Sequence, residues 1–244
     1  MKDIDWRDGH LPISTRFDDP YYSKEDGRAE TNHVFIHGNE LPTRWRHMQH
    51  CSIAELGFGT GLNFLETIRQ WKTMKPNGAT LDFISFEQFP MSGEEMAKAL
   101  SKWPELEPLA NRLIDRWNSK GEIFSFCLQS ELVEGSIDEG CINLTVHFGD
   151  ANEILSRLSF KADAWYLDGF SPAKNLELWN ECLMQEVGKH TVADGTFATY
   201  TAAGFVRRNL ASAGFDVLKS KGFGRKRDML TGKLSNDIDV AKRH

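Results

Sequence analysis

The segment "IAELGFGTGLNFL", residues 53–65, constrains the fold of this 244-residue chain more than any other stretch. It begins as an apolar run typical of a buried strand, continues with glycines at every second position, and ends in the apolar spacing of a helix. A glycine turn between a strand and a helix leaves backbone N–H groups free at the positive end of the helix. The segment therefore predicts an α/β fold with a cofactor site at this turn.

The rest of the chain alternates between strand-like and helix-like segments. This alternation predicts an α/β fold with a doubly wound, mostly parallel sheet of seven strands, flanked by helices. The last two strands, expected within residues 215–223 and 226–234, are joined by a short loop. Since short connections join antiparallel strands, we expect a C-terminal hairpin at the end of the sheet.

The length suits one domain with additions. We expect an N-terminal extension or flap in residues 1–50, a main domain in residues 51–236 and a tail or linker in residues 237–244. An insertion around residues 91–140 is expected to hold helices and a hairpin. Residues 33–41, "HVFIHGNEL", are expected to form a short strand and a turn.

The glycine spacing selects between two nucleotide cofactors. Gly57, Gly59 and Gly61 form G-x-G-x-G, whereas the dinucleotide pattern of dehydrogenases requires a third glycine where Leu62 stands. The shorter pattern, with Glu55 before it, suits an amino acid joined to a nucleoside. S-adenosylmethionine (SAM) is such a molecule, and it carries no phosphate. The spacing therefore favours SAM over NAD, and a side chain at any of the three glycines is expected to block its methionine end.

Acidic residues at the ends of other predicted strands support this choice. Glu87 ends the second strand, where an acidic side chain accepts hydrogen bonds from the ribose hydroxyls of a bound nucleoside. Asp150 follows a later strand and is expected to accept from the adenine amino group. The predicted SAM contacts are Glu55, Gly57, Gly59, Gly61, Asn63, Glu87, Gln88, Asp150 and Asp168.

The stretch "YLDGFSPAKN" indicates the chemistry. Asp168 ends a predicted strand, and ligands of open α/β sheets bind at the carboxyl ends of strands. D-G-F-S-P resembles the (D/N)-P-P-(Y/F) loop of methyltransferases that act on amino nitrogens. An amine attacks a methyl group only with its lone pair free, so a carboxylate that orients the ammonium and accepts its proton is useful there. We predict Asp168 and Phe170 as the catalytic residues, with Phe170 stacking on a base.

Charge is unevenly distributed along the chain. The net charge of −6 does not indicate a nucleic-acid binder, but residues 205–230 are locally basic. The cations of this basic segment are Arg207, Arg208, Lys219, Lys221, Arg225, Lys226 and Arg227.

Other features exclude several protein classes. The four cysteines form no CxxC pair, so we expect neither a metal site nor a disulfide framework. The sequence contains no run of 18 apolar residues and begins without the apolar core of a signal peptide. We therefore expect no membrane association and a cytoplasmic location.

Many of these stretches together resemble the methyltransferase domain of the MnmC family of bifunctional tRNA-modifying enzymes. The resemblance covers residues 14 to 234 and rests on "FDDPYYS", "ELGFGTGLNFL", "FISFEQFP", "HFGDANE", "AWYLDGFSPAKN", "TYTAAGFVRRNL" and "KGFGRKRDML". It implies SAM-dependent methylation of 5-aminomethyl-2-thiouridine at the tRNA wobble position. It also implies an FAD-dependent oxidase domain as a partner in bifunctional members. No second glycine pattern for FAD is present, so the oxidase step is not assigned to this chain.

A tRNA substrate implies contacts with the anticodon loop, where unstacked bases rest on aromatic rings and phosphates meet cations. The predicted tRNA contacts are Tyr21, Tyr22, Lys174, Tyr200, Arg207, Arg208, Lys221, Arg225, Lys226 and Arg227. Two alternatives stay open at this point. One is a small-molecule amine methyltransferase or a spermidine-synthase-like transferase, which has no need of the basic segment. The other is a non-catalytic tRNA-binding module, which has no need of Asp168.

Overall fold

A mixed eight-stranded sheet forms the centre of the protein, whose computed structural model describes residues 3–129 and 140–235. The strands lie in the order β10-β11-β9-β8-β4-β5-β7-β6. Their bounds are β4 (His50–Leu56), β5 (Thr80–Glu87), β6 (Ile123–Gln129), β7 (Cys141–Phe148), β8 (Ala162–Leu167), β9 (Thr191–Thr199), β10 (Phe215–Lys221) and β11 (Asp228–Leu234). The predicted tail, residues 237–244, lies outside the described residues.

The five central strands, β9, β8, β4, β5 and β7, run parallel. At one end, β11 pairs antiparallel with β9, and β10 with β11, which confirms the predicted C-terminal hairpin. At the other end β6 pairs antiparallel with β7. The sheet has eight strands where seven were predicted, because β6, which lies in the expected insertion, pairs with β7 at the edge of the sheet.

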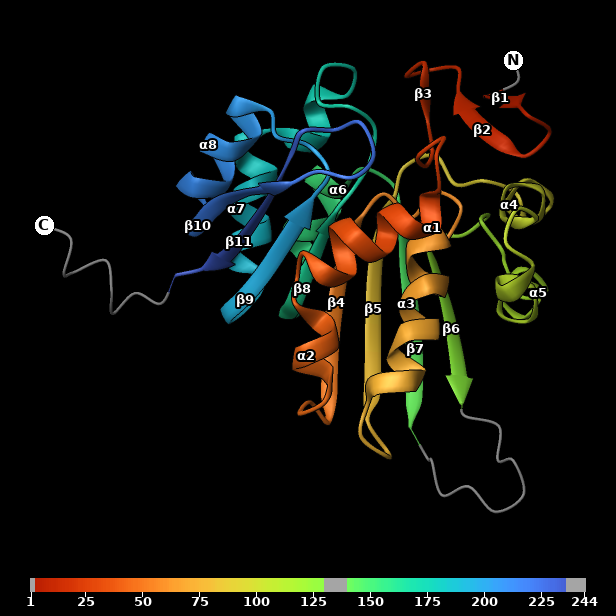
Figure 1. Cartoon of the computed structure of the whole chain (residues 1–244), viewed down its shortest axis with the longest axis horizontal. Helices are drawn as coiled ribbons and strands as arrows, with labels where there is room; N and C mark the ends of the chain where they lie inside the picture. The colour runs from red at the N-terminus through yellow and green to blue at the C-terminus, as the bar shows by residue number, and fades with distance from the viewer. Residues whose placement is uncertain (1–2, 130–139, 236–244) are drawn as a thin grey trace, which may run out of the picture.

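Helices cover both faces of the sheet (Figure 1). One face carries α1 (Gly27–Glu30), the π-helical η1 (Thr31–His37), α2 (Leu41–Trp45) and α3 (Leu62–Met74), with α4 (Gly93–Leu100), η2 (Pro104–Leu106) and α5 (Glu107–Ile114) beside them. The other carries α6 (Ala151–Ile154), η3 (Leu155–Arg157), η4 (Leu176–Trp179), α7 (Glu181–Lys189) and α8 (Gly204–Ser212). The layered α/β architecture is the one that the sequence predicts.

Strand alternation divides the buried side chains into two cores. Along β4, Cys51 and Ile53 pack into the core under α1–α3, whereas Ala54 and Leu56 pack into the core under α7 and α8. Since successive side chains of a strand point to opposite faces, a shift of one residue would exchange the two sets. The packing therefore fixes which backbone atoms emerge at the carboxyl edge of the sheet.

The prediction of a strand and turn at residues 33–41 is wrong, because η1 and the start of α2 are helical there. The Asp26 carboxylate caps α1 by accepting from the backbone N–H groups of Arg28 and Ala29, and the chain continues from α1 directly into η1. A buried run such as Val34–Ile36 suits a helix as well as a strand, so periodicity alone does not distinguish them.

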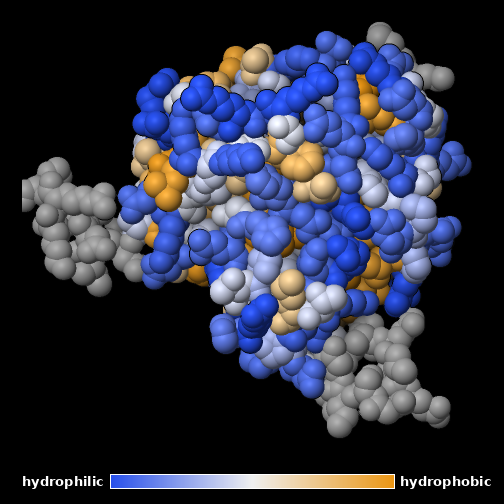
Figure 2. Space-filling view, viewed as in Figure 1, coloured by the Kyte–Doolittle hydropathy of each residue, from blue (hydrophilic) through white to orange (hydrophobic). Residues whose placement is uncertain are grey.

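A small antiparallel sheet precedes α1 and lies beyond the carboxyl ends of the parallel strands (Figure 1). It consists of β1 (Ile4–Arg7), β2 (Leu11–Ser14) and β3 (Asp19–Pro20). Figure 2 shows that the viewed face of the molecule is mostly hydrophilic, with hydrophobic residues in small separate patches. Among the described residues, no helix is both long and apolar enough to span a membrane.

Candidate active site

A cavity of about 440 Å³ opens where the sheet, the N-terminal segment and the C-terminal hairpin loop meet. The sheet side of its lining consists of Gly57, Phe58, Gly59, Thr60, Leu62, Asn63, Glu87 and residues 168–171. The outer side consists of residues 19–24, Gly27, Glu30, Thr31, Phe35, Tyr200 and Lys226. The cavity thus joins segments from both ends of the chain at the carboxyl edge of the sheet.

The three glycines of the loop differ in what surrounds them. All have positive φ, +87° at Gly57, +53° at Gly59 and +77° at Gly61, which other L-residues rarely adopt. A Cβ on Gly57 would lie 3.3 Å from the Gly169 Cα. A Cβ on Gly59 would lie 3.3 Å from the Tyr21 ring. Both glycines line the cavity, so its shape depends on the missing side chains.

Gly61 does not fit the expectation that a side chain there would block a ligand. A Cβ on Gly61 would meet Phe58 at 3.2 Å and Leu113 at 3.4 Å, and Gly61 does not line the cavity. Its positive φ instead lets the chain turn into α3, where it is the N-cap residue. The third glycine is therefore a requirement of the turn and not of the ligand.

Glu87 is held in one orientation by the loops around it. Its two carboxylate oxygens accept from the backbone N–H groups of Gly59, at 2.8 Å, and Phe89, at 2.7 Å. Burial raises the pKa of the carboxyl despite these hydrogen bonds, which favour the ionised form. Glu87 lines the main cavity and also a second, smaller one, so it stands between the two.

Two further residues predicted to contact SAM line the second, smaller cavity. Gln88, which is exposed, and Asp150 both line it. The Asp150 carboxylate caps α6 by accepting from the backbone N–H of Asn152 at 2.9 Å. Because Gly57, Glu87 and Phe170 line both cavities, the two lie next to each other.

Glu55 lies beneath the glycine loop and does not line the cavity. Its side chain is fully buried and accepts from Asn63 Nδ2 at 2.9 Å and Ser85 Oγ at 2.7 Å. Burial raises the pKa of Glu55 well above its ordinary value. Asn63 Nδ2 also donates to Asp168 Oδ2 at 2.8 Å. Glu55 therefore acts on the site by orienting Asn63, which in turn orients Asp168.

Asp168 follows β8 directly and faces the cavity half-buried. Besides the bond from Asn63, its Oδ1 accepts from the backbone N–H of Gly169 at 2.8 Å. Burial raises the pKa of Asp168 to about 7, and these hydrogen bonds oppose that effect. A carboxyl group with a pKa near neutrality can both accept and release a proton at physiological pH.

Aromatic rings form part of the cavity lining. Phe170 stacks on Phe17 with ring centroids 4.6 Å apart and meets Tyr21 edge-on at 5.0 Å. The backbone N–H of Ser171 donates to Asp19 Oδ2 at 2.8 Å, which ties the N-terminal segment to the loop after β8. Phe170 and Tyr21 thus line the cavity in a fixed arrangement.

Two predicted tRNA contacts have structural partners instead. The Tyr22 hydroxyl donates to the carbonyls of Ala99 and His10, and its ring packs edge-on against Trp103. Tyr22 lines the cavity but is only 7% exposed, so these contacts hold its ring in place. Lys174 donates to the backbone carbonyl of Asp18, so it ties the same N-terminal segment to the loop after β8.

Glu30, which no sequence pattern identified, lies in the cavity lining together with Lys226, which was predicted as a tRNA contact. Glu30 Oε1 accepts from Lys226 Nζ at 3.0 Å inside the cavity wall. Lys226 Nζ also lies 3.8 Å from the centre of the Tyr200 ring. The Tyr200 hydroxyl donates to the Gly169 carbonyl at 2.8 Å. No spacing signal links Glu30 to Lys226, because 196 positions separate them.

Residues 104–235 match the family described as S-adenosyl-L-methionine-dependent methyltransferase, which is more than half of the chain. The chain belongs to this family. It is 44% identical, over 97% of its length, to the tRNA 5-methylaminomethyl-2-thiouridine biosynthesis bifunctional protein MnmC of Marinobacter nauticus. A protein of the same name from Leptospira borgpetersenii is 42% identical over 96% of the chain. The chain spans 37% and 35% of the lengths of these relatives.

A solved structure confirms the fold of this methyltransferase. The crystal structure of MNMC2 from Aquifex aeolicus superposes with a TM-score of 0.73 at 24% identity. The match covers 98% of this chain and 74% of the other. The family establishes SAM as the methyl donor. The fold agrees with the predicted sheet.

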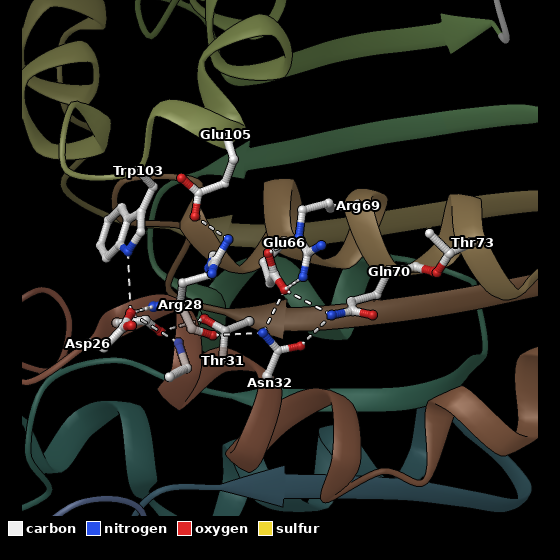
Figure 3. A network of polar contacts seen from close by, with 12 residues as sticks. Asp26, Arg28, Thr31, Asn32, Glu66, Arg69, Gln70, Thr73, Trp103 and Glu105 are labelled. Atoms are coloured by element: carbon white, nitrogen blue, oxygen red, sulfur yellow. Dashed lines mark hydrogen bonds and ion pairs between the residues drawn. The ribbon is translucent and has the colours of Figure 1, made fainter.

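A buried polar network holds α1 and η1 of the methyltransferase against α3 (Figure 3). At its centre the fully buried Glu66 accepts from Asn32, Arg69 and Gln70. Burial alone would raise the pKa of Glu66, but these hydrogen bonds lower it below its ordinary value. The network fixes the helix from which Glu30 enters the cavity.

The basic segment divides into two groups of cations. In the hairpin loop, Arg225 Nε lies 3.7 Å from Glu25, and Lys226 pairs with Glu30. On α8, Arg207 and Arg208 are exposed and have no ion pair with a described residue. Lys221 and Arg227 are likewise exposed. The α8 cations thus have no ion pair with a described residue, whereas Arg225 and Lys226 of the hairpin loop are paired.

Proposed function

We propose that this chain transfers a methyl group from SAM to the amine of 5-aminomethyl-(2-thio)uridine at the tRNA wobble position, giving 5-methylaminomethyl-(2-thio)uridine. One observation carries the chemistry: Asp168, with a pKa near 7, lies in the same cavity as the glycine loop. The names of the curated relatives support the choice of substrate.

The two linked cavities fit SAM. Gly57 and Gly59 leave room for the methionine part, because a Cβ on Gly57 would lie against Gly169 and a Cβ on Gly59 against the Tyr21 ring. Glu87 has a fixed carboxylate for the ribose hydroxyls, and Asp150 with Gln88 lines the end suited to adenine. Bound SAM supplies an electrophilic methyl group on its sulfonium. Gly61 and Glu55 shape the turn and orient Asn63.

Asp168 prepares the acceptor. A substrate ammonium would hydrogen-bond to its carboxylate, which Asn63 and the Gly169 N–H hold in place. As an ionised base with a pKa near 7, Asp168 takes the proton that frees the lone pair of the amine. The neutral carboxyl group that results offsets less of the positive charge on the SAM sulfonium. Proton transfer and methyl transfer are therefore coupled. Phe170 and Tyr21 provide an aromatic wall for the uracil ring.

The outer contacts follow from charge and exposure. We assign phosphate binding to the exposed cations Arg207, Arg208, Lys221, Arg225 and Arg227. Residues 1–50 serve as a flap on the domain of residues 51–236, since residues 19–24 line the cavity. A cytoplasmic location follows from a tRNA substrate. An FAD-dependent oxidase domain stays a predicted partner, because the chain spans only about a third of its bifunctional relatives.

The test is incubation with labelled SAM and tRNA from cells that lack the final methylation, followed by mass analysis of the nucleosides. The expected product is 5-methylaminomethyl-2-thiouridine, formed at the expense of the aminomethyl nucleoside. Label in a different nucleoside, or label only in a small-molecule amine supplied alongside, would contradict the proposal.

A further inference from the structure

The cavity already contains an ammonium group, that of Lys226. It lies 3.0 Å from Glu30 Oε1 and 3.8 Å from the centre of the Tyr200 ring. A carboxylate beside an aromatic face is a favourable environment for any cation of this kind. We call this arrangement of Glu30 and Tyr200 the ammonium seat.

The two partners of the ion pair differ in how firmly they are held. Glu30 is 9% exposed, its other oxygen accepts from the backbone N–H of Ser23 at 3.0 Å, and the network of Figure 3 fixes its helix. Lys226 reaches in from the rim on a long side chain that is 45% exposed. Its ammonium can therefore leave the seat for water at low cost, whereas the Glu30 carboxylate would stay and need a new cation.

The seat belongs to the reacting end of the cavity. The Tyr200 hydroxyl donates to the carbonyl of Gly169, the residue after Asp168. Glu30 also raises the pKa of Asp168 and Lys226 lowers it, although burial is the larger influence. A second ammonium that replaced Lys226 on Glu30 would thus lie within the field of the carboxylate that we assign to proton transfer.

We propose that Glu30 is a specificity-determining residue, whose carboxylate binds a primary ammonium of a ligand in the place that the Lys226 ammonium occupies. The inference rests on the proposed function. Two ligands supply this chemistry there: the aminomethyl group of the acceptor uridine and the α-ammonium of SAM. Either ligand displaces Lys226 and leaves the Glu30 carboxylate paired. The carboxylate therefore favours ligands that carry an ammonium group over ligands that do not.

The test uses Glu30→Gln, which keeps the shape and the acceptor for Ser23 but removes the charge. The measurements are the Kd of SAM by calorimetry and the affinities for two tRNAs, one with 5-aminomethyl-2-thiouridine and one with unmodified uridine at the same position. We expect a loss of about tenfold or more either in the preference for the aminomethyl tRNA or in SAM affinity. The first outcome identifies the acceptor as the source of the ammonium, and the second identifies SAM.

Lys226→Met is the matched variant, because it keeps the alkyl chain and removes the competing ammonium. It should change the same quantity in the opposite direction, so that the preference for the aminomethyl tRNA, or the affinity for SAM, increases. A ratio of two tRNA affinities cancels any phosphate contact of Lys226. Unchanged SAM affinity and an unchanged ratio in both variants would overturn the inference. A wild-type protein that does not methylate the aminomethyl tRNA would instead refute the proposed function.

Discussion

The cavity has two walls of different origin. The sheet wall, with Gly57, Glu87 and Asp168, consists of residues that end or directly follow parallel strands, at the edge where the carboxyl ends of those strands meet. The outer wall, with Glu30 and Lys226, joins residues 196 positions apart in the chain. The first wall belongs to the fold and carries the methyl-transfer chemistry. The second depends on contacts between distant segments of the chain and, on our account, binds a primary ammonium.

The largest effect should come from the sheet wall. Asp168→Asn keeps the shape of the side chain but cannot accept a proton, so we expect methyl transfer to fall about 100-fold or more. SAM affinity should fall far less, since most of the predicted SAM contacts remain. Single-turnover rates and calorimetry measure the two quantities. The exposed Asp115→Asn serves as control, and a variant at Asp168 with an undiminished rate would remove that residue from the chemistry.

A pair of glycines separates backbone strain from ligand contact. Gly57 and Gly78 have similar positive φ, +87° and +71°, but a Cβ on Gly78 would meet nothing within 4 Å. Both Gly→Ala changes should cost about 1 kcal/mol or more of folding stability. Only Gly57→Ala should also weaken SAM binding, by about tenfold. Equal SAM affinity in the two variants, measured by calorimetry alongside thermal unfolding, would show that the close approach at Gly57 has no role.

A smaller effect is expected from pH. The pKa of Asp168 is raised from 3.8 to about 7, so the folded protein binds this proton more tightly than the unfolded chain. The corresponding stability is fully present below pH 3.8 and is lost as the pH rises through about 7. The ionised form attracts the sulfonium, so SAM should bind severalfold more tightly at pH 8 than at pH 6. Asp168→Asn should flatten both profiles, and a pH-dependent SAM affinity that survives this change would assign the effect to another group.

The smallest effects concern the two groups of cations. Reversing Arg207 and Arg208 to Glu should weaken tRNA binding severalfold and reduce the salt slope by about one to two. Reversing Arg225 alone should matter less, because Glu25 already pairs with it. Filter binding over a range of salt concentrations measures both. The opposite order of effects would place the tRNA on the hairpin loop and not on α8.

The residues of the sheet wall could be predicted from the sequence, because the patterns that identify them lie within short stretches of the chain. Strand periodicity, the glycine spacing and the acids at strand ends placed Gly57, Glu87 and Asp168 correctly around one cavity. The outer wall depends on tertiary packing, which no single-sequence pattern encodes. Glu30 was missed for that reason. Gly61 and Glu55 were placed at the right motif, but their side of the turn faces the protein interior.

Short polar and aromatic motifs were equally ambiguous. In "FDDPYYS" the two tyrosines are adjacent, yet Tyr21 lines the cavity beside Phe170 while Tyr22 packs against Trp103. Tyr22 also lines the cavity, but its ring and hydroxyl are held by Trp103, Ala99 and His10, so adjacency in the sequence does not show how each side chain is held. Residues 33–41 failed for a different reason, because a short buried apolar run suits a helix and a strand alike.

The central claim is that the methyl acceptor is the amine on the wobble uridine. It is tested most directly by single-turnover transfer of labelled methyl to two tRNAs of identical sequence. One carries 5-aminomethyl-2-thiouridine at the wobble position, and the other carries 2-thiouridine there. We predict that label enters only the aminomethyl tRNA and that Asp168→Asn abolishes most of this transfer. Equal labelling of the two tRNAs, or no labelling of the aminomethyl tRNA, would contradict the account.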